Sequence, residues 1–228
     1  MERELLWGPC RHHIGEVILS GVWDGLKIEV AKSPEITLFE RFRDNYDHLS
    51  YMDVSNLYFL EIEENYQARK SEVVELIKTI LNNKKFAYRG DYTSLLKVSL
   101  VLLTGDVSNF KMPRPGAITK ARWMMRAIIA ISIILMRNKI SSELPKNCII
   151  KSTQEEKLIR FVKFIVLIYV PWWVTCPLPA DSPINDLKLL KDIQNYPDDT
   201  ISSSAEKKVH LHSWYLTEEM VPLALFSS

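Results

Sequence analysis

The chain has 228 residues, of which 47% are apolar and 25% are charged, and its formal net charge is +1. This length suffices for one large or two small hydrophobic cores, and the composition is that of a globular protein rather than a disordered one. A near-neutral charge indicates no partner by itself, so contact with nucleic acid or a membrane would require a local patch. The seven glycines are too few for a turn-rich all-β fold.

The cysteines and the N-terminal residues indicate the compartment in which the protein is expected. Cys10, Cys148 and Cys176 are odd in number and far apart, so we expect no disulfide framework and a reducing, intracellular compartment. The N-terminal stretch contains acids and no apolar run, which is unlike a secretory signal.

Apolar residues recur at helical spacing along most of the chain. The expected helices cover residues 12–24, 33–46, 62–81, 91–104, 117–138, 154–174, 181–193, 205–214 and 217–226. Gly25 and Gly105 are placed to end two of them, and Thr153 with Glu156 forms a capping box.

Three stretches between these helices have other expected roles. Residues 26–30 alternate apolar and charged side chains and could form one short strand. Residues 141–152 are polar and contain a proline, which indicates a linker. Residues 195–204 are polar, and we expect them to be mobile.

Two of the expected helices are apolar on nearly every side. The helix over 117–138 contains the uncharged run Ala127–Met136, and the helix over 154–174 contains Phe164–Val174, where Pro171 should kink or end it. Both runs are shorter than the roughly 20 residues that a bilayer requires, so no membrane contact is expected. The chain is therefore predicted to be all-α, an irregular bundle of about eight to nine helices around these two buried ones.

The tetrapeptide Cys10-Arg-His-His13 could be half of a zinc site. A Cys-x-x-His step places both side chains on one side of a turn, and His210, His212 or Cys176 could complete the ligand set. Four ligands at a recognised spacing are absent, however. The favoured interpretation is a buried Cys10 and a His13 that packs at a helix start, with no metal assigned.

Carboxylates offer a second possible metal site. Glu16 lies shortly after the Cys-His element, and Glu218 and Glu219 are adjacent near the C-terminus. Paired carboxylates can hold Mg²⁺ for phosphoryl chemistry. A helix start after Thr217 also favours acids in its first turn, and this explanation is preferred.

Cations surround Trp123 where the central loop enters the buried helix 117–138. Such a cluster suits a nucleic-acid backbone, and solvated cations around a half-buried indole are the favoured alternative. The cluster consists of Lys111, Arg114, Lys120, Arg122 and Arg126.

Four sequence blocks together resemble a known group of proteins. They are Cys10–Leu19, Met112–Ile128, Thr175–Leu187 and Trp214–Phe226. In order and chemistry they are similar to the C-terminal part of transposon-derived animal proteins of the hAT and Mutator-like kind. The resemblance implies an RNase H-like enzyme that holds two Mg²⁺ with Asp, Asp and Glu, with a Cys-x-x-His pair and a helical insertion containing an Arg-Trp element.

Matched to that pattern, Cys10 and His13 correspond to the Cys-x-x-His pair, Arg122-Trp123 to the Arg-Trp element, and Glu219 to a vestigial catalytic Glu, with Glu218 next. Both catalytic Asp residues would precede the first residue of this sequence. Two-metal chemistry cannot run on one carboxylate.

The resemblance also implies how the single helical domain, residues 1–228, divides. Residues 1–30 would be a remnant of the RNase H-like core, 31–204 an insertion-like helical region, and 205–228 terminal helices that carry the candidate Glu.

Three functional hypotheses follow. The first is a truncated, inactive transposase-derived protein that binds at most DNA, which would place it in the nucleus, or a transposase chain. The alternative is a helical protein-interaction module with no nucleic-acid role, which exposes apolar surface around Trp172-Trp173 and self-associates. The third is a complete Mg²⁺-dependent nuclease; no cofactor is expected otherwise. It would gather Glu16, Asp181, Asp186 and Glu219 at one site.

Overall fold

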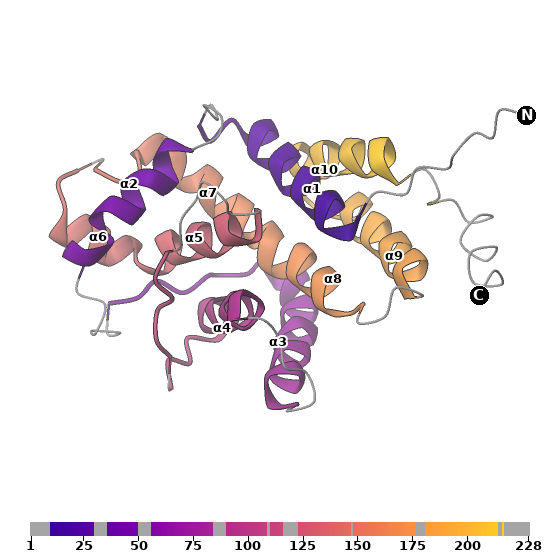
Figure 1. Cartoon of the computed structure of the whole chain (residues 1–228), viewed down its shortest axis with the longest axis horizontal. Coiled ribbons are helices and arrows are strands. Elements are labelled where there is room, and N and C mark those ends of the chain that lie inside the picture. The colour runs from indigo at the N-terminus through magenta and orange to yellow at the C-terminus, as the bar shows by residue number, and fades with distance from the viewer. Residues whose placement is uncertain are drawn as a thin grey trace, which may run out of the picture.

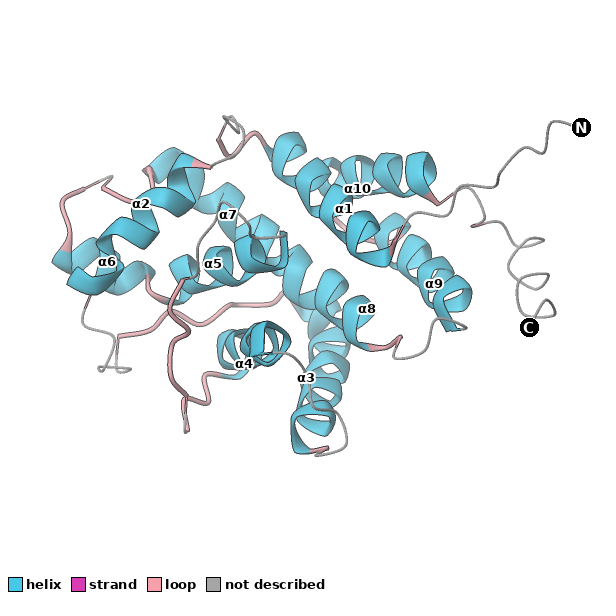
Figure 2. Cartoon of the chain, viewed as in Figure 1, coloured by secondary structure: helices cyan, strands magenta, loops and turns pink. Residues whose placement is uncertain are grey.

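The computed structural model describes residues 10–29, 36–49, 56–83, 90–108, 110–115, 123–146, 148–176, 181–213 and 216. Within these residues the regular structure is entirely helical and no strand occurs (Figure 2), which confirms the all-α fold class. In chain order the elements are α1 (Arg11–Leu26), α2 (Thr37–Asn45), the 3₁₀ turns η1 (Tyr46–His48) and η2 (Glu64–Tyr66), α3 (Gln67–Asn82), α4 (Gly90–Thr104), α5 (Trp123–Leu135), α6 (Arg137–Glu143), α7 (Ser152–Phe164), the π-helical turn η4 (Ile165–Tyr169), α8 (Val170–Val174), α9 (Ser182–Gln194) and α10 (Asp199–His212).

The centre of the molecule is α5, which packs against α1, α2, α4 and α7 (Figure 1). Every residue from Ala127 to Met136 is buried, as the unbroken apolar run predicted. The run α7–η4–α8 is the second buried element, and its residues 164–172 are all buried as well. No described helix combines the length and the apolar character that a membrane crossing requires.

The helix expected over 117–138 is broken at Met136. Its first residues, 117–122, lie outside the described part, and α5 ends at Leu135 before α6 begins. The amide of Tyr58, in the extended segment before η2, donates to the carbonyl of Leu135 at 2.8 Å. That carbonyl would otherwise accept from the amide of Lys139, so the outside donor explains the joint between α5 and α6.

Pro171 does not end its helix, because the π-helical turn precedes it and the helical backbone continues to Val174. A proline lacks the amide that would bond to the carbonyl four residues earlier, which here is Leu167. The Arg69 side chain takes the place of that amide, since its Nε donates to Leu167 O at 3.1 Å. The sequence predicted that Pro171 would kink or end the helix. Pro171 does not end it, and the helix is distorted into a π-helical turn just before the proline.

The end of α1 also differs from the prediction. The helix runs past Gly25 to Leu26 and closes at Lys27, which has a left-handed backbone with φ of 51° and donates its amide to Asp24 O. Residues 26–29 therefore form a helix end and a turn rather than a strand. Gly25 instead provides room for Ser204 of α10, whose Cβ would lie 2.9 Å from a side-chain Cβ at position 25.

The mobile segment predicted over 195–204 is wrong, because α10 begins at Asp199. Asp198 caps it by accepting from the amide of Ile201 at 3.2 Å. The buried side chains Ile201, Ala205 and Val209 recur every four residues, and serines between them mask this pattern in the sequence. The boundary expected between residues 204 and 205 falls inside this helix.

Candidate functional site

A hollow of about 230 Å³ opens between α3, α8 and α9. Its lining combines an apolar floor with a polar rim, the usual composition of a binding pocket. The floor consists of Val73, Leu76, Pro171, Trp172 and Leu189. The rim consists of Arg69, Glu72, Thr175, Asn185, Lys188 and Asp192. We call this hollow and its rim the α3–α8–α9 cleft.

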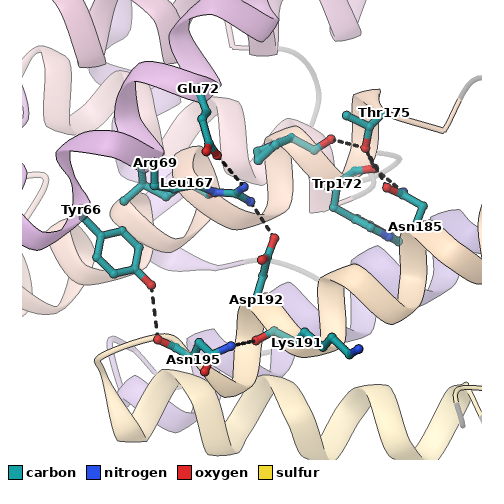
Figure 3. Close-up of polar contacts among 11 residues, drawn as sticks. Tyr66, Arg69, Glu72, Leu167, Trp172, Thr175, Asn185, Lys191, Asp192 and Asn195 are labelled. Atoms are coloured by element: carbon teal, nitrogen blue, oxygen red, sulfur yellow. Dashed lines mark hydrogen bonds and ion pairs between the residues drawn. The ribbon is translucent and has the colours of Figure 1, made fainter. Parts of the chain in front are cut away.

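Arg69 braces one side of the cleft (Figure 3). Besides its bond to Leu167 O, its guanidinium lies 2.7 Å from Asp192 Oδ2 on α9 and 3.4 Å from Glu72 Oε2 on α3. One planar cation thus joins α3, the π-helical turn and α9. Beside it, burial raises the pKa of Tyr66, an effect that the charge of Arg69 opposes.

The end of α8 forms the opposite side of the cleft (Figure 3). The Trp172 carbonyl accepts from Asn185 Nδ2 at 2.9 Å, and Asn185 Oδ1 accepts from Thr175 Oγ1 at 2.8 Å. A helix end leaves carbonyls without intrahelical partners. Asn185 of α9 satisfies one of them and ties α9 to α8.

The Trp172 side chain is held in place beneath this helix end. Its Nε1 donates to Asp186 Oδ1 at 2.6 Å, and Asp186 is only 1% exposed. The Arg11 guanidinium lies 4.5 Å from the centre of the indole, donates to Trp172 O at 3.0 Å, and lies 3.7 Å from Asp186. These contacts fix the part of the floor that Trp172 contributes.

The charges around the cleft leave one cation uncommitted. Arg69, Glu72 and Asp192 form a single ion-paired group, whereas Lys188 is exposed and, in the described part of the chain, is in no ion pair. The four charges sum to zero. A neutral hollow with an apolar floor is suited to an apolar side chain flanked by polar groups.

A second, larger hollow of about 520 Å³ lies around Arg160, Lys163, Tyr196 and Asp198. Its cations are already engaged: Arg160 bonds Asp198 through two contacts at 2.7 and 2.9 Å, and Lys163 pairs with Glu63. Burial alone would raise the pKa of Asp198, but the bonds from Arg160 and the helix amides hold it below its ordinary value. An anionic ligand would have to displace these carboxylates.

The predicted DNA-binding cations are only partly brought together. Lys120 and Arg122 lie outside the described residues. Lys111 and Arg114 are both exposed, and Arg114 forms two bonds to the Asp47 carboxylate, at 2.9 and 2.6 Å. The Arg126 side chain packs against Trp123.

The guanidinium of Arg126 is half-buried and lies 4.8 Å from the ring centre of Trp123. Burial lowers the pKa of Arg126, an effect that the nearby charge of Glu16 opposes. Trp123 itself is half-buried, in ring contact with Trp23 and Phe161. The aromatic member of the predicted cluster therefore belongs to the core margin.

The carboxylates proposed for a metal site lie in different settings. Glu218 and Glu219 are outside the described residues. Asp181 is exposed at the start of α9, Asp186 is buried against Trp172, and Glu16 is half-buried on α1. Within the described ranges, no three His, Cys, Asp or Glu side chains gather in a way that could hold a metal ion.

The Cys-x-x-His element opens α1. The prediction that Cys10 is buried is wrong: it is exposed, because it precedes the first helical turn and its side chain lies at the open end of the helix. His13 is exposed at the helix start, where its ring lies edge-on to His212 with ring centres 5.2 Å apart. Cys176 contacts Ser182 Oγ at 3.3 Å.

The sequence did not predict the cleft as a site. The expectation of exposed apolar surface around Trp172-Trp173 is wrong for Trp172, which is only 4% exposed, and Trp173 is half-buried. Pro171 within an apolar helix was the one available signal, since it forces a carbonyl to seek an outside donor. Comparisons of the chain with protein-family models, curated proteins and solved structures return no match.

Proposed function

We propose that this chain is a non-catalytic, self-associating helical module of transposase descent, and that its interaction site is the α3–α8–α9 cleft. The observation that carries the proposal is the preformed hollow of about 230 Å³, with its apolar floor and braced polar rim. Arg69 and Asn185 hold the three helices around it through hydrogen bonds, so an occupant meets an ordered surface.

The proposed occupant is the Leu211 side chain of a second copy. Leu211, on α10, is 65% exposed, more than any other large hydrophobic residue of the described chain. Lys207, exposed on the same helix, would meet the ion-paired group of Arg69, Glu72 and Asp192, which carries one net negative charge. This charge match favours a second copy over an unrelated apolar segment.

DNA binding is the second candidate function, and the exposure of both Lys111 and Arg114 on residues 110–115 favours it. Association of this kind depends on phosphate neutralisation, so it must weaken steeply as salt rises. The ion pair between Arg114 and Asp47 would have to open for Arg114 to bind a phosphate.

Sedimentation velocity over a range of protein concentrations tests the proposal. A single buried side chain with flanking contacts predicts a weak dimer, with a Kd of roughly 10–100 μM. Leu211→Ser removes the occupant and Leu76→Trp fills the hollow, so each variant alone should weaken association by at least about tenfold. Phe59→Ser, which removes an exposed apolar side chain elsewhere, is the matched control.

Mixing the two variants separates the proposal from general loss of folding. Leu211→Ser retains an intact hollow and Leu76→Trp retains an intact Leu211, so the mixture should regain a heterodimer. A wild-type chain that stays monomeric at several hundred micromolar, or a Leu211→Ser variant that dimerises normally, would contradict self-association through this cleft. Salt-sensitive retention on duplex DNA by such a monomer would favour the second candidate.

A further inference from the structure

A thiol, an imidazole and a phenol meet at the start of α1, and none of the three residues lines the cleft. Cys10 Sγ lies 3.7 Å from His12 Nδ1, and Cys10 is exposed. His12 Nε2 lies 3.1 Å from Tyr92 Oη on α4. The cluster therefore joins two helices that are far apart in sequence.

The imidazole of His12 is fixed from two sides. Tyr92 engages the nitrogen that faces away from the cysteine. Trp173 packs edge-on to the His12 ring with centres 4.6 Å apart, and it also contacts Tyr92 edge-on at 5.7 Å. With its proton on Nε2, His12 donates to Tyr92 and presents Nδ1 as an acceptor toward the thiol.

Nucleophile, base and orienting group at these positions form the arrangement used to activate a thiol. We propose that Cys10 is a nucleophilic thiol that undergoes exchange with small-molecule disulfides, with His12 as its base.

The exchange requires no reactant other than the disulfide. His12 Nδ1 accepts the thiol proton, and the Cys10 thiolate attacks one sulfur of the disulfide. A new S–S bond forms to Cys10 while the old S–S bond breaks. The departing thiolate takes the proton from His12, so Cys10 is oxidised to a mixed disulfide and half of the small molecule is reduced to a thiol.

The other two cysteines provide internal references. Both are half-buried, and Cys148 Sγ contacts Asn45 Oδ1 at 3.9 Å while Cys176 Sγ contacts Ser182 Oγ at 3.3 Å. An amide and a hydroxyl cannot act as bases toward a thiol at neutral pH, as an imidazole can. Exchange at Cys10 should therefore be the fastest of the three.

The test is incubation of the folded full chain with glutathione disulfide, followed by peptide mass mapping of all three cysteines over time. Cys10 should react at least about tenfold faster than Cys148 and Cys176. Exposure alone could produce that ranking, so the deciding variant is His12→Gln, which should slow Cys10 by about tenfold or more. His13→Gln, which removes the neighbouring imidazole, is the matched control and should leave the rate unchanged.

Tyr92 is a positioning residue in this scheme. Tyr92→Phe should slow exchange at Cys10 by about threefold while leaving the rates at Cys148 and Cys176 unchanged, because a general loosening of the fold would raise them. An unchanged Cys10 rate in His12→Gln, or a wild-type Cys10 no faster than Cys176, would overturn the proposal. Neither result would bear on the cleft, which is tested by self-association.

Discussion

Neighbouring helices are held together in opposite ways at the α1–α10 contact and at the α3–α8–α9 cleft. In the first, α10 lies beside α1 (Figure 1). Gly21 and Gly25 permit this approach, since a Cβ at position 21 would lie only 2.6 Å from Lys208 Cγ. In the second, Arg69 and Asn185 bridge helices around a hollow that remains open. Close contact through small residues leaves no space that a partner could occupy. Polar side chains that bridge between helices hold them apart and leave such a space.

The two regions should respond to different substitutions. The α1–α10 contact depends on the absence of side-chain atoms, so added volume should harm it most. The cleft depends on satisfied carbonyls and a buried carboxylate, so loss of a hydrogen-bonding group should harm it most. Substitutions at Asp186, Gly25, Arg69 and Asp198 test this difference between the two regions.

The largest effect is expected at Asp186 beneath the cleft. Asp186→Ala leaves the Trp172 indole N–H and the Arg11 guanidinium without their shared carboxylate, at a cost of about 3 kcal/mol in the free energy of unfolding. Urea denaturation measures it. Asp192→Ala, which removes a half-buried carboxylate from the rim, should cost roughly 1 kcal/mol; equal losses at the two sites would contradict the importance given to burial.

A loss of about 2 kcal/mol is expected for Gly25→Ala, because the new methyl group overlaps Ser204. The second substitution Ser204→Gly should restore part of the stability by removing that overlap. Gly90→Ala is the matched control, since nothing lies within 4 Å of a Cβ there. If Gly25→Ala were as stable as Gly90→Ala in thermal unfolding, the α1–α10 contact would not be as close as described.

These two regions also differ in how far the sequence reveals them. Helical periodicity and the apolar runs predicted the all-α class and the buried α5 and α7–α8 elements, because burial on every side requires apolar residues throughout. The α1–α10 contact was missed because small residues mediate it. Serines and glycines there are typical of loops in sequence, although their size is what permits helices to approach.

The cleft was missed for a different reason. Arg69 and Leu167 are 98 residues apart, and nothing local in the sequence indicates that one bonds the other. Because a proline has no amide hydrogen, the sequence alone does show that Leu167 O lacks its usual amide partner. Only the tertiary structure shows that a side chain from another helix supplies the donor, so that the helix continues past the proline that was predicted to kink or end it.

A smaller loss, about 1.5 kcal/mol, is expected for Arg69→Met, which leaves Leu167 O without its donor and also removes the ion pair with Asp192. Pro171→Ala would restore a backbone amide to that carbonyl. In a double-mutant cycle measured by urea unfolding, Arg69→Met should therefore cost roughly half as much in the Pro171→Ala background. Strict additivity of the two changes would show that Arg69 does not substitute for the missing amide.

The smallest effect on stability is expected at the start of α10, where an ion pair between Asp198 and Arg160 adds to the packing of the helix. The pKa of Asp198 is held below its ordinary value of 3.8, and this carboxylate both caps α10 and bonds Arg160. A carboxyl group whose pKa is lowered on folding binds more protons when unfolded, so its stabilisation is complete above 3.8 and disappears as pH falls through the lower folded value.

Asp198→Asn keeps a capping side chain but cannot titrate, so the variant should lose less stability than wild type as the pH falls below about 4. Thermal unfolding at each pH measures the difference. Asp199→Asn, which removes an exposed carboxylate from the first position of the same helix, is the matched control. If the thermal stability of Asp198→Asn and of wild type changed in parallel with pH, the Asp198 carboxylate would not contribute to the stability of α10. The α1–α10 contact would then depend on packing alone.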